Sequence, residues 1–130
     1  MLKRYSAALA VFAFSCHAAL AQPSISDFTQ PQIFAQWVQS RCIGAIADSA
    51  ALKADANASA AAWLEASDLP IEAFNQADFV IAQALKMPLG GTTKNDYRVL
   101  KCALIAQSPE TDALYKRFSR QKTARGVENF

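Results

Sequence analysis

Histidine is nearly absent from this sequence. The chain of 130 residues contains a single histidine, His17, and three cysteines. The serine and cysteine nucleophiles of common hydrolases need an imidazole whose pKa lies near neutral pH. Whether the chain has access to such chemistry therefore depends on whether His17 and its neighbour Cys16 stay in the working protein.

Residues 1–21 have the pattern of a signal peptide. Lys3 and Arg4 give a positive start, an apolar run of about 14 residues follows, and Ala19-Leu20-Ala21 forms an A-x-A cleavage motif. The run is too short to span a bilayer. We therefore expect cleavage before Gln22 and export of the remainder.

Cleavage at this point would remove Cys16 and His17 with the leader. Lipidation of Cys16 is the alternative, but the three residues before it, Ala13-Phe14-Ser15, lack the usual leucine and include a bulky phenylalanine. The exported chain would contain no histidine, and this excludes Ser-His-Asp and Cys-His catalysis. We expect no catalytic residues, no metal site and no cofactor.

The two remaining cysteines, Cys42 and Cys102, favour a disulfide, because an even number of cysteines in an exported protein is typical of one. A pair of buried thiols is the alternative. The bond would close a loop of about 60 residues, which loop entropy values at roughly 4 kcal/mol. Half-cystines supply neither a nucleophile nor zinc ligands.

Charge is balanced but unevenly distributed. After the leader, 11 basic and 11 acidic side chains remain, with seven acids and two bases in residues 27–78 and nine bases and four acids in residues 79–130. Net neutrality argues against nucleic acid as a ligand. The uneven distribution either orients a protein partner or neutralises itself within the fold.

No second long apolar segment follows the leader, so we expect no membrane association after cleavage.

Hydrophobic periodicity predicts an all-α fold, a small bundle of about five helices stapled by one disulfide. Phe34, Val38, Cys42 and Ile46 follow at steps of four and form one apolar stripe. A later helix is apolar nearly all round, which predicts a central position. The expected helices are Pro31–Asp48, Asn57–Ala66, one starting at Pro70, Asp96–Gln107, and one starting at Pro109 after a Ser108 cap. We assign residues 22–118 to one domain and residues 119–130 to a flexible basic tail.

One loop and one exposed aromatic are candidates for partner binding. The segment "MPLGGTTKN", residues 87–95, is glycine-flexible and lies between two expected helices. Phe79 falls among polar residues on the outer face of the third helix. The alternatives are that residues 87–95 are only a connector and that Phe79 is an ordinary exposed side chain.

Three segments together resemble one known family. They are "FAQWVQSRCIGAIAD", "DANASAAAWLEASDLPIEAFNQAD" and "DYRVLKCALIAQSPETDALYKRF". The chain is similar, over about Phe34–Phe118, to immunity proteins of the type VI secretion amidases, fourth amidase family. The 87–95 loop is where the resemblance is weakest.

The resemblance implies a periplasmic, all-helical and typically dimeric inhibitor that is not an enzyme. Its partner would be a cognate peptidoglycan amidase from a competing cell, whose substrate groove it would occupy with a protruding loop. On this sequence the partner-binding residues would be Phe79, Pro88, Leu89, Gly90, Gly91, Thr92, Thr93 and Lys94.

Two other functions remain open from the sequence. A helical scaffold of this size suits an inhibitor of a different exported toxin. It also suits a small-ligand carrier lined by Trp37, Trp63 and the alanine-rich second helix.

Overall fold

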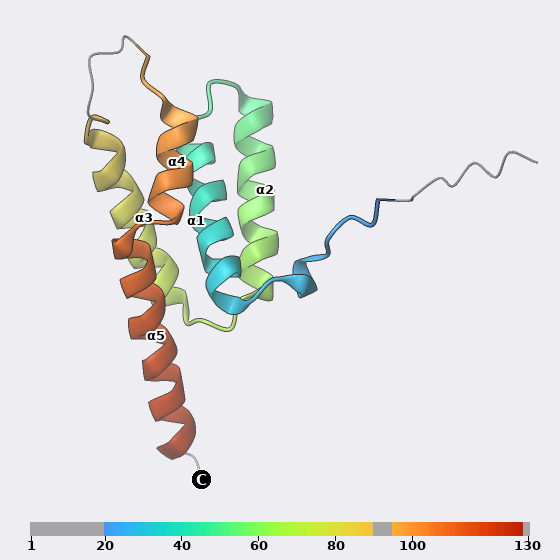
Figure 1. Ribbon diagram of the computed structural model, residues 1–130, viewed down its shortest axis with the longest axis vertical. Coiled ribbons are helices and arrows are strands. Elements are labelled where there is room, and N and C mark those ends of the chain that lie inside the picture. The colour runs from blue at the N-terminus through green and yellow to red at the C-terminus, as the bar shows by residue number, and fades with distance from the viewer. Residues whose placement is uncertain (1–19, 90–94, 129–130) are drawn as a thin grey trace, which may run out of the picture.

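The computed structural model describes residues 20–89 and 95–128, and over these residues every regular element is a helix (Figure 1). One short 3₁₀ helix precedes five α-helices. The elements are η1 (Ile25–Asp27), α1 (Gln30–Ile46), α2 (Ala50–Ala66), α3 (Ile71–Lys86), α4 (Arg98–Ala106) and α5 (Pro109–Glu128). The predicted all-α bundle of about five helices is confirmed.

Helix α1 is the central element, in contact with each of the other four α-helices. It begins at a capping box, in which the Thr29 Oγ1 accepts from the Gln32 backbone N–H at 3.4 Å and the Gln32 Oε1 accepts from the Thr29 backbone N–H at 2.9 Å. The predicted stripe is buried, since Phe34, Val38 and Cys42 are each 0% exposed. The four-residue spacing therefore identified the core face of this helix correctly.

Aromatic rings fill the core beside α1. Trp37 packs edge-on against Phe74 with ring centroids 4.9 Å apart, and Phe34 does so at 5.6 Å. Tyr115 of α5 also packs near Phe34, with ring centroids 6.3 Å apart. These contacts join α1, α3 and α5 into one apolar cluster.

Small residues allow α2 to lie close to α1. Ala56 and Ala60 are buried against it, and a Cβ placed on Gly44 would come 2.9 Å from the Asn57 Oδ1. The helix starts at Ala50, a full seven residues before the expected start at Asn57. The expectation was wrong because the cap is Ser49, whose Oγ accepts from the Leu52 backbone N–H at 3.1 Å, and the alanine-rich residues that follow are strong helix formers.

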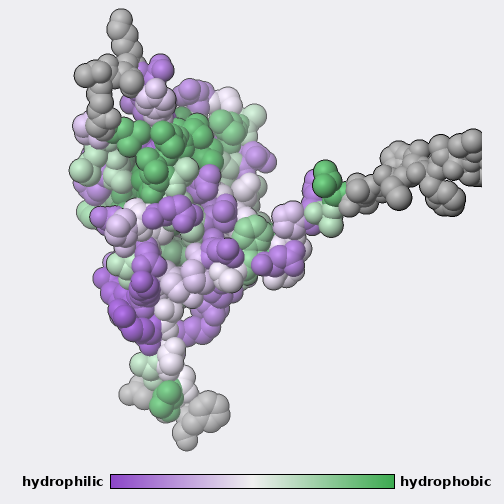
Figure 2. All heavy atoms as spheres, viewed as in Figure 1, coloured by the Kyte–Doolittle hydropathy of each residue, from purple (hydrophilic) through white to green (hydrophobic). Residues whose placement is uncertain are grey.

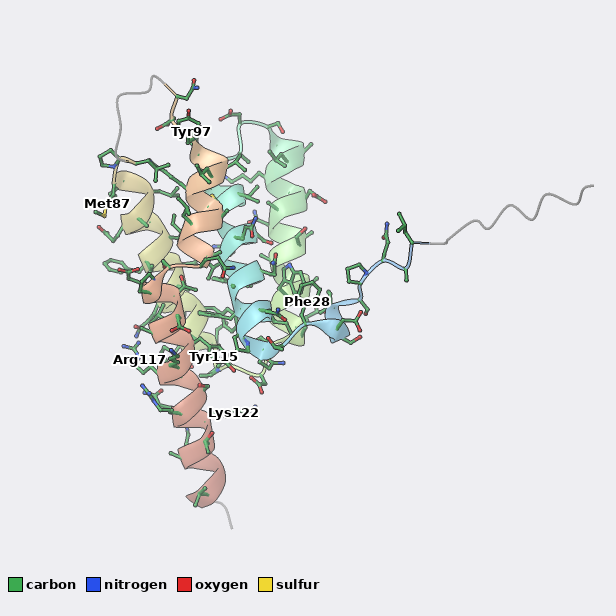
Figure 3. The ribbon with its side chains drawn as sticks, in the orientation of Figure 1. Phe28, Met87, Tyr97, Tyr115, Arg117 and Lys122 are labelled. Carbon is green, nitrogen blue, oxygen red and sulfur yellow. A yellow bond between two sulfur atoms is a disulfide. The ribbon has the colours of Figure 1, made fainter. Side chains whose placement is uncertain are left out.

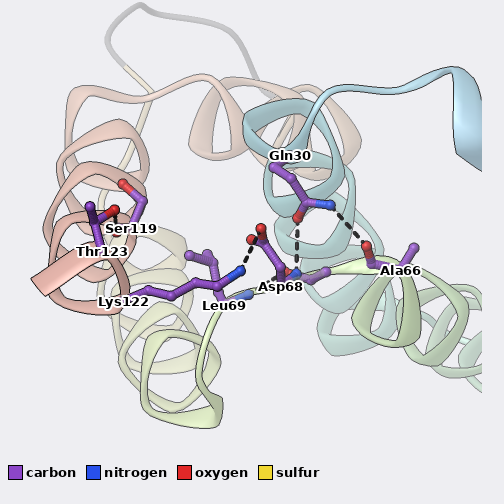
Figure 4. Close-up of polar contacts among 8 residues, drawn as sticks. Gln30, Ala66, Asp68, Leu69, Ser119, Lys122 and Thr123 are labelled. Carbon is purple, nitrogen blue, oxygen red and sulfur yellow. Dashed lines mark hydrogen bonds and ion pairs between the residues drawn. The ribbon is translucent and has the colours of Figure 1, made fainter. Parts of the chain in front are cut away.

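A glutamine side chain fixes the turn between α2 and α3 to the start of α1. The Gln30 Nε2 donates to the Ala66 carbonyl at 3.1 Å, and the Gln30 Oε1 accepts from the Asp68 backbone N–H at 2.9 Å (Figure 4). The same figure shows the Asp68 carboxylate paired with Lys122 of α5 at 2.8 Å. One end of the bundle is thereby held by polar contacts that link three parts of the chain.

Helix α5 extends beyond the expected domain end. We expected the helical domain to finish at Phe118, with a tail over residues 119–130, but α5 continues to Glu128. Within this extension, Lys122 forms an ion pair with Asp68, which ties α5 to the turn before α3. The Thr123 Oγ1 donates to the Ser119 carbonyl at 3.2 Å. Polar and basic composition alone does not end a helix when its residues have good helix propensity.

The predicted disulfide between Cys42 and Cys102 is confirmed. Both side chains are 0% exposed, and the bond joins α1 to α4 with a Cα–Cα distance of 5.4 Å. The two cysteines are 60 residues apart in the sequence, so the bond removes a large loop-closure entropy from the unfolded chain.

Removing this bond should destabilise the leader-free protein. We expect the double variant Cys42→Ala/Cys102→Ala to lower the free energy of unfolding by up to about 4 kcal/mol, measured by urea denaturation followed by circular dichroism. As a control, thiol titration of the denatured, unreduced parent should give no free thiol. Two free thiols in the parent would contradict the stabilising role.

Candidate functional site

The segment between α3 and α4 carries most of the residues predicted to bind a partner. Helix α3 ends at Lys86, and the Met87 backbone N–H donates to the Ala84 carbonyl at 3.1 Å. Pro88 is exposed and Leu89 is half-buried. Gly90, Gly91, Thr92, Thr93 and Lys94 lie outside the described residues.

Both attachments of this segment lie at the same end of the bundle. Figure 3 shows Met87 and Tyr97 there, on either side of the connection between α3 and α4. Arg98 at the start of α4 pairs with Asp48, in the turn between α1 and α2, at 3.3 Å. The connection is therefore anchored next to a turn of the α1–α2 pair.

An apolar groove runs from this end along the outside of α3. Phe79, the predicted anchor, is 67% exposed and so is Met87, two turns further along the helix. The groove has a volume of about 270 Å³. Its walls come from α3, α4 and the start of α5, through Phe79, Val80, Gln83, Ala84, Met87, Ile105, Ser108 and Glu110. Phe79 thus shares one apolar groove with Met87, the residue that follows the end of α3.

Helix α4 adds a second exposed apolar surface, which the sequence analysis missed. We expected this helix over Asp96–Gln107 in a central position, but it spans Arg98–Ala106 and buries only one face. Val99 is 66% exposed, and Leu100 and Leu104 are each 49% exposed. Figure 2 shows hydrophobic residues gathered over α4 and its surroundings, and hydrophilic residues over the lower part of the molecule.

The sequence pattern of this helix is compatible with either a central or a half-exposed position. An apolar helix can be buried on all sides, or can pack on one side and present the other to a partner. The helix is short, and Leu100 and Leu104 lie four residues apart on the side opposite Cys102. Nothing in the periodicity itself separates the two possibilities.

Two charged clusters of the bundle are paired within themselves and lie outside the groove, whereas Glu110 forms part of the groove wall. Arg41 makes two hydrogen bonds to the Asp78 carboxylate, at 3.0 and 3.1 Å, and a third to the Asn57 Oδ1 at 3.2 Å. At the far end of the bundle, burial raises the pKa of the Tyr115 hydroxyl above its ordinary value of 10.0, and the Asp68 carboxylate adds to the effect while Lys122 opposes it. Neither cluster lines the groove at Phe79 and Met87.

Two acidic side chains near the starts of α3 and α5 have basic partners. Asp68 is paired with Lys122, and Asp112 with Lys116 one turn away at 2.7 Å. Among the described residues, no group of three or more histidine, cysteine, aspartate or glutamate side chains is arranged to hold a metal ion. Over the same residues, no helix is long and apolar enough to cross a membrane. The features that stand out are surfaces suited to binding another molecule.

The tryptophans proposed to line a carrier cavity are used for packing. Trp37 is 4% exposed and contacts Phe74. Trp63 packs edge-on against Phe28, from the segment before α1, with centroids 5.1 Å apart. Neither arrangement favours a small-ligand carrier.

Comparison with known families identifies the fold and the class. The family model Tai4, described as the amidase immunity protein of the type VI secretion system (T6SS), matches residues 32–115. The chain belongs to the Tai4 family. The resemblance inferred from the sequence is therefore correct.

Solved structures similar to this Tai4-family chain are also complexes that contain Tai4. A chain in the crystal structure of the effector Tae4 from Salmonella typhimurium in complex with the immunity Tai4 from Enterobacter cloacae is 58% identical, with a TM-score of 0.70 over 73% of this chain and 98% of that chain. The Tae4–Tai4 complex from Enterobacter cloacae gives 58% identity and a TM-score of 0.69, over 73% of this chain and 97% of that chain.

A more distant structure shares the fold. In the Tae4/Tai4 system from Salmonella typhimurium, a chain is 23% identical, with a TM-score of 0.66 over 75% of this chain and 96% of that chain. A comparison with curated proteins finds no match.

Two phenylalanines on α3 provide a test of the exposed surface. Phe79→Ala should change the free energy of unfolding by no more than about 0.5 kcal/mol, because the ring is mostly exposed. Phe74→Ala on the same helix should cost about 3–5 kcal/mol, because that ring is 2% exposed in the core. Thermal or urea unfolding measures both, and a large loss for Phe79→Ala would mean that this ring serves the fold rather than a partner.

Proposed function

We propose that the protein is an immunity protein that binds a peptidoglycan amidase of the Tae4 type and inhibits it by blocking its substrate groove. The observation that carries the proposal is the 58% identity to a chain in two Tae4–Tai4 complexes, matched over nearly the whole of that chain. The protein would act without catalysis, by steric exclusion of the amidase's substrate.

The surface at the α3–α4 end is suited to this role. The segment Pro88–Lys94 combines two glycines with threonines and a lysine, so it can present a polar, adaptable tip. The apolar groove at Phe79 and Met87 lies beside its first residues. Affinity in such interfaces comes from a few buried anchors surrounded by contacts that exclude water. We assign the tip to the amidase groove, and Phe79 to an anchor next to it.

We further propose that the protein works in the periplasm after loss of residues 1–21, and as a homodimer. The positive start, apolar run and A-x-A motif support export. A buried disulfide agrees with an oxidising compartment. The dimer rests on the family resemblance.

Inhibition of a different exported toxin is the remaining alternative, because one helical scaffold can carry several specificities. No described feature favours it over a Tae4-type partner. The carrier hypothesis is less well supported, since Trp37 and Trp63 are committed to packing.

An inhibition assay tests the proposal. The leader-free chain should inhibit peptidoglycan cleavage by purified Tae4 of Enterobacter cloacae. Replacing Gly90, Gly91 and Thr92 together by arginine should abolish inhibition, because bulky charges cannot enter a groove shaped for an extended peptide.

A matched control is Ala62→Arg, which adds a charge at an exposed position of α2. This variant should inhibit like the parent, and all the proteins should show equal helicity by circular dichroism. If the parent does not inhibit, the proposed function is wrong. If the triple variant inhibits as well as the parent, the contact lies elsewhere on the molecule.

Export can be tested separately. The chain recovered from a periplasmic fraction should begin at Gln22 when its intact mass is measured. Ala21→Tyr should block processing, because the peptidase has shallow pockets that accept only small residues at this motif. A mature chain beginning at a lipidated Cys16 would overturn the assignment of residues 1–21.

A further inference from the structure

The groove beside α3 contains a side chain whose chemistry the proposed function does not use. Met87 directly follows α3, is 67% exposed and forms part of the groove wall. Figure 3 shows it at the outer edge of the molecule, at the end of α3. A thioether in this position is open to oxidants in solution, and these convert methionine to its sulfoxide.

The other groups that oxidants attack are protected in the exported chain. The two cysteines that remain after the leader are 0% exposed and already joined as a disulfide. Trp37 is 4% exposed and Trp63 is half-buried, and peroxide oxidises an indole much more slowly than a thioether. The sequence contains one other methionine, Met1, which the expected cleavage removes. Met87 is therefore the single thioether of the exported chain.

The fold does not depend on this side chain. Met87 donates its backbone N–H to the Ala84 carbonyl, and oxidation of the sulfur leaves that bond unchanged. An oxygen atom on the sulfur therefore changes the surface of the groove and not the bundle beneath it. The buried side of α3 holds this helix in place, through residues that are between 0% and 3% exposed: Ala73, Phe74, Ala77 and Ile81.

Oxidation changes the chemistry of the groove at this point. The apolar part of its wall comes from Phe79, Val80, Ala84 and Ile105. A sulfoxide oxygen is a hydrogen-bond acceptor, and burying an acceptor without a donor costs free energy. Glu110 is the charged residue among the described residues that line the groove, and an ionised carboxylate is itself only an acceptor. It cannot pair with the new oxygen.

We propose that Met87 is a site of reversible oxidation by peroxide and that its sulfoxide weakens binding of the amidase. The inference rests on the proposed function, which places an apolar contact at this groove, and it adds a condition under which that contact is lost.

The chemistry of the site is complete with peroxide as the oxidant. The Met87 sulfur attacks one peroxide oxygen, the O–O bond breaks, and the hydroxide that leaves takes the proton from the new S–OH group to form water. The sulfur is oxidised and the peroxide is reduced. A methionine sulfoxide reductase reverses the step, since it removes the oxygen as water while a pair of thiols is oxidised to a disulfide.

Mass spectrometry of the exported chain tests the modification. Hydrogen peroxide, at a dose that oxidises free methionine completely, should add one oxygen atom per chain, and peptide mapping should place it on Met87. Met87→Leu keeps a similar apolar volume and should take up none. Helicity and melting temperature should be the same before and after treatment. A chain that stays unoxidised, or that is oxidised first at another residue, would overturn the inference.

Affinity for Tae4 of Enterobacter cloacae, measured by isothermal titration calorimetry, tests the consequence. Peroxide is removed with catalase before mixing, so that only the immunity chain is oxidised. The oxidised parent should bind on the order of tenfold more weakly than the untreated parent. Treatment with methionine sulfoxide reductases should restore both the mass and the affinity.

Two variants assign the effect to this side chain. Met87→Leu should bind like the untreated parent both before and after peroxide, because it keeps the apolar wall and cannot be oxidised. Met87→Gln should bind weakly without any peroxide, because it places a polar amide where the sulfoxide would lie.

The outcomes distinguish this inference from the proposed function. If the untreated parent does not bind the amidase, the proposed function fails, and with it the effect of oxidation on binding. If the untreated parent binds and the oxidised parent binds equally well, the proposed function stands and the inference is wrong. If Met87→Leu loses affinity after peroxide as the parent does, the damage lies at another residue and the inference is wrong as well.

Discussion

The covalent bond between Cys42 and Cys102 is the constraint on which the proposed contact end of this molecule depends. Helix α4 has only nine residues, and a helix of that length is marginal without tertiary contacts. Its buried face is small, consisting of Lys101, Cys102, Ile105 and Ala106. The disulfide attaches this short element to the central helix, so the position of α4 and of the connection before it follows from the position of α1.

Contacts with the rest of the bundle fix the position of α1, to which α4 is attached. Helix α1 is held by the aromatic cluster around Phe74 on one side and by the close, small-residue contact with α2 on the other. Gln30 and the Asp68–Lys122 pair fix the end of the molecule opposite the proposed contact surface. These polar cross-links hold one end, while Val99, Leu100 and Leu104 of α4 are exposed nearer the other. This separation suits a protein that acts by holding a surface against a partner.

The helical class, the core stripe of α1 and the disulfide were predicted correctly, because the four-residue spacing of apolar side chains and the even number of cysteines after the leader favoured these readings over their alternatives. Pro109 after Ser108 located the start of α5, where the Ser108 Oγ accepts from the Thr111 backbone N–H. The start of α2 was missed, because the alanine-rich residues that follow its Ser49 cap show no clear apolar period. The exposed face of α4 depends on tertiary position, which periodicity does not contain.

An inhibitor without catalytic groups must obtain its effect from shape and from order established before binding. A loop rich in glycine adapts to a groove but loses conformational entropy when it is enclosed. A disulfide-bonded helix beside it loses little, because its freedom was removed when the protein folded. In the proposed function, the loop would supply steric exclusion and the ordered helices beside it would supply apolar area at low entropic cost. The fold is retained at 23% identity, so the surface residues of such a scaffold can change while the bundle that supports them remains.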